Sequence, residues 1–118
     1  MKRIILSFVL IVLAGSASLE AHAFLKGAEP SVGSTVQTAP NEVRIRFTEN
    51  IEPAFSKIQV FNLSGNEVDK RDVHLDRSDP AVLQVSLSPL GSGTYKVVWR
   101  VVSVDTHVTE GSFSFHVR

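Results

Sequence analysis

The chain has 118 residues, no cysteine and one methionine, and its 12 Lys and Arg residues are balanced by 12 Asp and Glu residues. This length is enough for one domain. The absence of cysteine excludes disulfides, iron–sulfur clusters, cysteine-ligated zinc and thiol catalysis. A net charge of zero offers no basic surface from which to predict nucleic-acid binding.

The first 21 residues have the layout of a secretory signal peptide. Lys2 and Arg3 precede an almost entirely apolar run over residues 4–15, and small or polar residues follow as far as Ala21. The run is shorter than the roughly 20 apolar residues that cross a bilayer. We therefore predict a signal peptide over 1–21 and a mature domain over 22–118. An exported protein without cysteine suits a bacterial periplasm.

The cleavage point decides whether the mature protein keeps His22. A cut after Ala21 makes His22 the first residue. A cut after Ala23 fits the small-x-small rule more literally, through Ala21 and Ala23, and removes the histidine. The cleavage pattern alone leaves both cuts open.

The rest of the chain is predicted to be all β. No stretch keeps a helical apolar period for three turns, whereas several short stretches alternate apolar and polar residues with a period of two. Clusters of Gly, Pro, Asn and Asp separate these stretches and leave no room for crossover helices. We expect an immunoglobulin-like Greek-key β-sandwich of about seven strands, with Trp99 in the core and Tyr95 as a corner tyrosine. The alternating stretches cover residues 42–47, 57–60, 83–88, 95–102 and 112–117.

The sequence shows no serine nucleophile elbow, no phosphate-binding glycine loop and no interpretable pair of catalytic carboxylates. Candidate chemistry therefore lies with the histidines. Asp105 and His107 are two residues apart. If the strand that begins at Tyr95 continues through them, both side chains face one side and can converge on a divalent metal. The alternative is a surface loop with an Asp–His hydrogen bond and no ligand.

His22 offers two nitrogens if it is the first residue, its amine and its imidazole. With the imidazole of His107 and an oxygen of Asp105, the donors complete a square of nitrogen and oxygen, which favours Cu(II). The alternative is a chain end without function. Glu49 follows a predicted strand and is either a further ligand, a hydrogen-bond partner of one, or a turn carboxylate.

Two other histidines are weaker candidates for metal ligands. We expect His116 to be a solvent-exposed residue of the last strand, and we give His74 at most a secondary contact. His74 lies in the most charged stretch, residues 69–79, which we expect to be a solvated loop with an irregular strand.

Several segments together resemble the CopC family of periplasmic copper-resistance proteins. The resemblance implies a β-sandwich that binds one Cu(II) ion through His22, Asp105 and His107, and in some members through Glu49. It favours the cut after Ala21, and it implies an exported copper carrier that works beside a CopD-type inner-membrane protein. The segments are His22 at the mature N-terminus and residues 29–33 (EPSVG), 39–40 (AP), 43–49 (VRIRFTE), 93–103 (GTYKVVWRVVS) and 105–115 (DTHVTEGSFSF).

The chain departs from some members of that family, which carry a second, Cu(I) site in a methionine-rich loop. The one methionine is Met1, and residues 63–79 hold charged side chains where such a loop is expected. Any copper must then be bound through nitrogen and oxygen, which favours Cu(II) over Cu(I).

Two other functions remain as alternatives. Copper held by an N-terminal histidine also occurs in oxidative enzymes that cleave polysaccharides, but the inward strand positions of the aromatic residues leave no docking face. The second alternative is a metal-free immunoglobulin-like structural module, for which replacing His22 or His107 would change only local packing.

Overall fold

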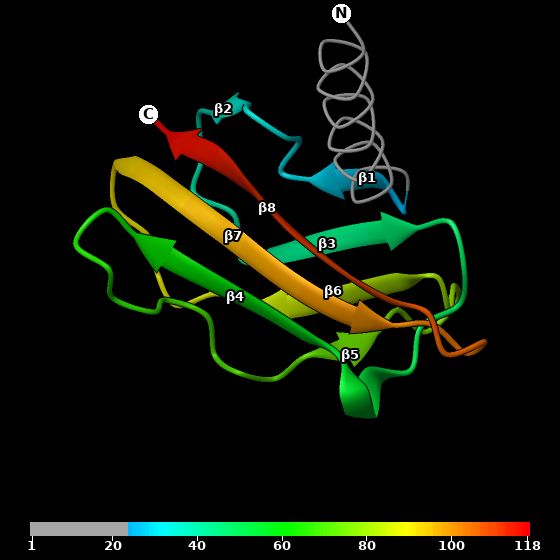
Figure 1. Cartoon of the computed structure of the whole chain (residues 1–118). Helices are drawn as coiled ribbons and strands as arrows, with labels where there is room; N and C mark the ends of the chain where they lie inside the picture. The colour runs from blue at the N-terminus through cyan, green and yellow to red at the C-terminus, as the bar shows by residue number, and fades with distance from the viewer. Residues whose placement is uncertain (1–23) are drawn as a thin grey trace, which may run out of the picture.

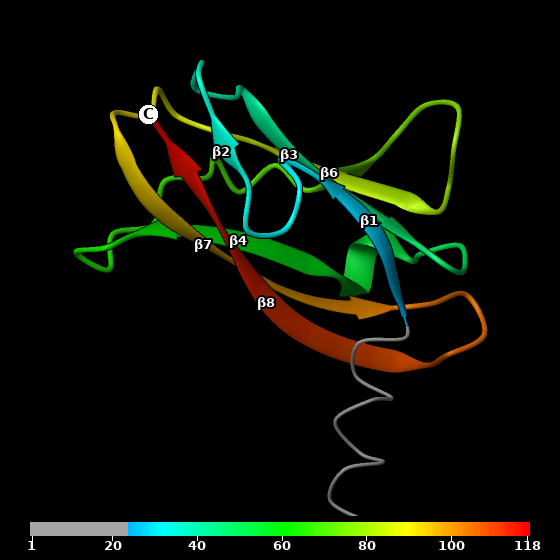
Figure 2. The ribbon, with the colours of Figure 1, turned by 90° about the horizontal axis from the view of Figure 1, so that it is seen from above.

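The structure, a computed structural model, describes residues 24–118. The predicted signal peptide, His22 and both candidate cleavage points lie outside these residues. The described chain folds into two stacked sheets, seen face-on in Figure 1 and from above in Figure 2. One sheet has the strand order β1 (Leu25–Glu29), β3 (Glu42–Phe47), β6 (Val82–Ser86) and β5 (His74–Leu75). The other has the order β2 (Thr35–Val36), β8 (Val108–Val117), β7 (Gly93–Val102) and β4 (Lys57–Asn62).

The predicted all-β sandwich is confirmed. The strand count is eight within the described residues instead of about seven, because β2 and β5 are short pairings of two residues each. Such two-residue strands carry no alternating pattern that a sequence could reveal. Among the described strands the chain changes sheet at every connection except β5 to β6 and β7 to β8, and β7 and β8 form a long antiparallel hairpin.

The core lies between the sheets and is formed by the apolar positions of the alternating stretches. Trp99 is 3% exposed, and its ring meets that of Phe47 edge-on with centroids 5.4 Å apart. Gly111 faces Trp99 across the β7–β8 pairing. A Cβ at Gly111 would lie 2.7 Å from the indole ring, so only glycine leaves room for this ring.

Tyr95 ties the start of β7 to the turn before it. Its ring stacks on Phe115 inside the sandwich, with centroids 5.5 Å apart. Its hydroxyl donates a hydrogen bond to the carbonyl oxygen of Gly91 at 2.8 Å. This bond to the backbone four residues upstream is the contact expected of a corner tyrosine.

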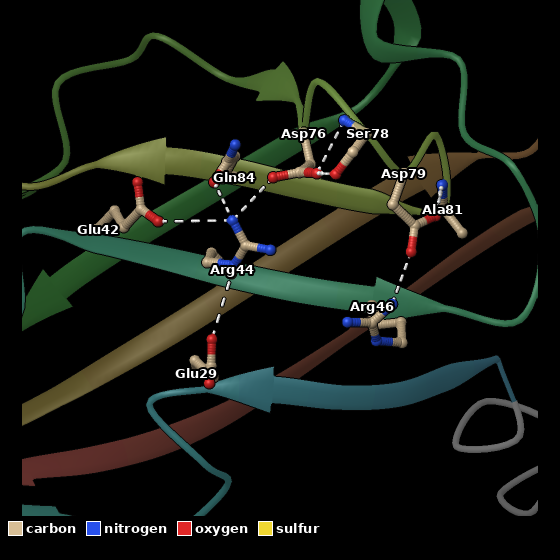
Figure 3. A network of polar contacts seen from close by, with 9 residues as sticks. All are labelled: Glu29, Glu42, Arg44, Arg46, Asp76, Ser78, Asp79, Ala81 and Gln84. Carbon is tan, nitrogen blue, oxygen red and sulfur yellow. Dashed lines mark hydrogen bonds and ion pairs between the residues drawn. The ribbon is translucent and has the colours of Figure 1, made fainter.

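A polar network covers the outer face of the first sheet (Figure 3). The guanidinium of Arg44 on β3 donates hydrogen bonds to Asp76 and to Gln84, each at 2.9 Å. It also lies 3.6 Å from Glu29 and 3.8 Å from Glu42. Arg44 thereby links β1, β3 and β6 to the loop that follows β5.

The charged stretch over residues 69–79 differs from the predicted solvated loop at Asp69. This residue is 8% exposed, and its carboxylate accepts hydrogen bonds from the backbone N–H groups of Val60 at 2.8 Å and Arg71 at 3.2 Å. The reason is that β4 is an edge strand, whose outward N–H at Val60 needs an acceptor. The irregular strand expected in this stretch is β5.

Candidate metal centre

Two loops from opposite sheets meet at one end of the sandwich (Figure 1). One follows β3 and carries Glu49, and the other is the turn over residues 103–107 between β7 and β8. A β-bridge joins Ile51 to Ser103, and the N–H of Val104 donates to the carbonyl oxygen of Asn50 at 3.0 Å. These backbone contacts hold the two loops against one another.

Glu49, Asp105 and His107 form a cluster where these loops meet. Nδ1 of His107 lies 3.6 Å from Oε2 of Glu49 and 3.5 Å from Oδ1 of Asp105. One ligand atom from each residue lies within 4.8 Å of the other two, and among residues 24–118 this is the one such group of three. The side chain of His107 is 70% exposed and that of Asp105 is 53% exposed. An imidazole and two carboxylates thus converge at an open surface, in an arrangement able to hold a divalent metal ion.

Asp105 and His107 meet by a different route from the one predicted. They do not lie on a continued strand, because β7 ends at Val102. The chain turns instead, with the N–H of Thr106 donating to the carbonyl oxygen of Ser103 at 2.9 Å and with a φ of 70° at Thr106. The turn brings the two side chains together as a strand would have done.

The two carboxyl groups of the cluster influence each other's ionisation. The pKa of Asp105 is lowered. The largest cause is the hydrogen bond from the hydroxyl of Ser103, and the second is the hydrogen bond with Glu49. The pKa of Glu49 is raised, chiefly by its hydrogen bond with Asp105 and then by desolvation. Asp105 is therefore the first of the pair to become a carboxylate and to offer a negative charge to a cation.

Ser103 belongs to this site, although the sequence assigned it no role. It is 1% exposed, and its hydroxyl donates to Oδ1 of Asp105 and accepts from the N–H of His107 at 3.1 Å. A serine just before a turn is a known pattern for such local hydrogen bonds. Because this pattern is common, it could have predicted the local hydrogen bonds of Ser103 but not a role in supporting metal ligands.

The structure does not bring the remaining described histidines to this cluster. His74 is exposed, and its Nδ1 lies 2.6 Å from the carbonyl oxygen of Asp72. His116 lies 2.8 Å from the hydroxyl of Thr94 through Nδ1. The expectation that His116 is solvent-exposed is wrong, because β2 runs alongside β8 at this position and leaves it half-buried. In the part of the chain that the structure describes, no helix has the length and apolar character to cross a membrane.

The fold and this cluster define a small β-sandwich with a candidate metal centre at one end. Residues 25–118 match the CopC domain family. Because this match covers most of the sequence, the chain belongs to the CopC family, as the resemblance in its sequence predicted.

Three relatives show how close this relation is. The chain is 38% identical to copper resistance protein C of Pseudomonas syringae pv. tomato, over 95% of each chain. The solved structure of CopC from Methylosinus trichosporium OB3b has a TM-score of 0.74 and 34% identity, covering 81% of this chain and 93% of that one. The structure of PcoC from Escherichia coli, described as a methionine-rich copper resistance protein, has a TM-score of 0.71 and 33% identity, covering 82% of this chain and 99% of that one.

Proposed function

We propose that this protein is a periplasmic carrier that binds one Cu(II) ion, with roles in copper transport or resistance. The ligands are the amine and imidazole of His22 as the first residue of the mature protein, the imidazole of His107 and a carboxylate oxygen of Asp105. Glu49 is a further ligand or a hydrogen-bond partner. The observation that carries this proposal is the cluster of Glu49, Asp105 and His107.

The path of the chain before β1 supports the participation of His22. The carbonyl oxygen of Phe24 accepts a hydrogen bond from the N–H of Thr48 at 3.1 Å, and Glu49 follows Thr48 directly. His22 is two positions before Phe24 in the sequence, and two residues of extended chain reach at most about 7 Å. A histidine at this position is thus close enough in sequence to meet the cluster. Cleavage after Ala21 would provide it with a free amine.

The available donors support Cu(II) as the cargo. The sequence has no cysteine and no methionine beyond Met1. A site built from imidazole, amine and carboxylate suits Cu(II), whereas thiolates and thioethers favour Cu(I). The relative described as methionine-rich differs from this chain in that respect.

The surface favours a carrier over an oxidative enzyme. Cleavage of a polymer needs a docking face, which usually presents aromatic side chains. Trp99, Tyr95 and Phe47 are all buried in the core. Among the large apolar residues that are exposed in the described chain, Phe55 is the one aromatic. We therefore propose binding and transfer without turnover, with a CopD-type inner-membrane protein as the copper partner.

The test combines intact mass with copper titration of the exported protein. We expect a mass that begins at His22 and binding of one equivalent of Cu(II) after chelator treatment and reloading. A protein that binds no Cu(II) would overturn the carrier and favour a metal-free structural module. Copper-dependent peroxide production would favour the oxidative enzyme instead.

A further inference from the structure

The hydroxyl of Ser103 contacts both residues of the β7–β8 turn that carry candidate ligands. Its Oγ–H donates to Oδ1 of Asp105, and its Oγ accepts from the backbone N–H of His107 at 3.1 Å. Ser103 is 1% exposed, whereas the side chains of Asp105 and His107 are mostly exposed. One buried hydroxyl thus links two surface groups to the interior.

Backbone contacts fix Ser103 itself from two sides. Its N–H donates to the carbonyl oxygen of His107 at 2.9 Å, and its carbonyl oxygen accepts from the N–H of Thr106 at 2.9 Å. The bridge to Ile51 joins it to the loop that carries Glu49. The hydroxyl therefore occupies a defined position relative to all three members of the cluster.

A fixed hydroxyl changes what a metal ion meets at this surface. An exposed carboxylate on a turn has rotational freedom, and the loss of this freedom on binding opposes affinity. The hydrogen bond from Ser103 holds Asp105 in one orientation beforehand. A carboxylate has about four lone-pair sites, so one hydrogen bond leaves others open to a metal.

We propose that Ser103 is a positioning residue for Cu(II), which holds Asp105 and His107 in their binding arrangement without touching the metal. The inference rests on the proposed function, since it requires Asp105 and His107 to be ligands. Partners of this kind orient metal ligands in other proteins, and their loss lowers metal affinity about 10- to 100-fold.

The first test is Ser103→Ala, with Ser56→Ala as its matched control. Ser56 also lies near the end of β7, where its hydroxyl donates to the carbonyl oxygen of Glu52 at 2.7 Å and accepts from the N–H of Val102 at 3.0 Å. We expect the Kd for Cu(II), measured by chelator competition, to rise about 10- to 100-fold in S103A. We expect S56A to keep the parental Kd and the parental copper EPR spectrum.

A second pair separates the hydroxyl from packing and remains informative if S103A does not fold. Threonine and valine have nearly the same shape, but only threonine has a hydroxyl. We expect Ser103→Thr to keep the parental EPR spectrum and Cu(II) affinity, and Ser103→Val to lose both. A folded S103A or S103V with parental Kd and EPR spectrum would overturn the positioning role. If the parent itself bound no Cu(II), or if His107→Ala bound it like the parent, the proposed function would fail instead.

Discussion

At the scale of single residues, His107 is the nitrogen donor of the described cluster, and most of its side chain faces solvent. Its side chain is 70% exposed and its neighbours at 3.5–3.6 Å are carboxylates, so little burial is lost when the imidazole is removed. The effect of removing it should therefore appear in metal binding and leave the fold intact.

Replacing His107 with alanine tests this expectation. Loss of one of three proposed nitrogen donors should weaken Cu(II) binding at least about 100-fold, beyond the 10- to 100-fold effect typical of outer partners. The thermal unfolding midpoint without metal should stay within a few degrees of the parent. His74→Ala is the matched control, because His74 is an exposed histidine outside the cluster. Equal Cu(II) affinities in these two variants would contradict the site.

Gly111 offers a test of the packing that supports the site's strands. In Gly111→Ala the new Cβ would lie 2.7 Å from the buried Trp99 ring, which also packs against Phe47. We expect unfolding free energy to fall by about 1–3 kcal/mol, as overpacking does, in urea denaturation followed by Trp99 fluorescence. Gly27→Ala is the control, since a Cβ there meets nothing within 4 Å. A stability of G111A equal to that of G27A would contradict this account.

The residue types of the site were predictable, but some of their contacts were not. The Asp105–His107 spacing and the His22 amine suggested copper from donor chemistry alone. The proximity of Glu49 depends on the bridge between Ile51 and Ser103, which joins segments about 50 residues apart in sequence and leaves no local pattern. Ser103 contacts residues two and four positions away, and serines before turns make such contacts too often for the pattern to predict a role at a metal site.

At the scale of elements, the strands were predictable wherever one face is buried and the other is exposed to solvent. The apolar positions of β3, β4 and β7 are buried as their period-two pattern predicted. Pairings without such a pattern were not predictable. The burial of Asp69 depends on the position of β4 at the edge of its sheet, and β2 is recognisable only once β8 lies beside it.

The link between β3 and the loop after β5 should make the stability of the fold depend on pH in the acidic range. The side chain of Ser78, then Arg44 and the N–H of Ser78, lower the pKa of Asp76 from 3.8 to about 2. A carboxyl whose pKa is lower in the folded state stabilises the fold above its unfolded pKa, and this contribution disappears as the pH falls. The loss should therefore fall between about pH 4 and pH 2.

Asp76→Asn isolates this contribution. The amide cannot ionise, so the urea midpoint of D76N should fall less steeply than that of the parent between pH 4 and pH 2. Asp72→Asn is a useful comparison, because Asp72 also has a lowered pKa but contacts Ser86 instead of Arg44. Parallel pH profiles for D76N and the parent would show that Asp76 makes no such contribution.

At the scale of the whole molecule, the sandwich brings loops from both sheets to one end and presents three candidate ligands there before any metal arrives. The same arrangement places Phe24 beside Thr48, on the loop that carries Glu49. The fold thus supports an open candidate centre, with the side chains of Asp105 and His107 more than half exposed. Such an open centre suits the proposed release of copper to a partner.

The most direct test of this account is the Cu(II) affinity of the mature protein with one extra glycine ahead of His22. The added residue moves the free amine away from the imidazole of His22 and removes their joint chelation, while residues 24–118 keep their sequence. We predict one tightly bound Cu(II) in the protein that begins at His22 and a large loss of affinity in the extended protein. Equal Cu(II) affinities in the two proteins would contradict the proposed centre.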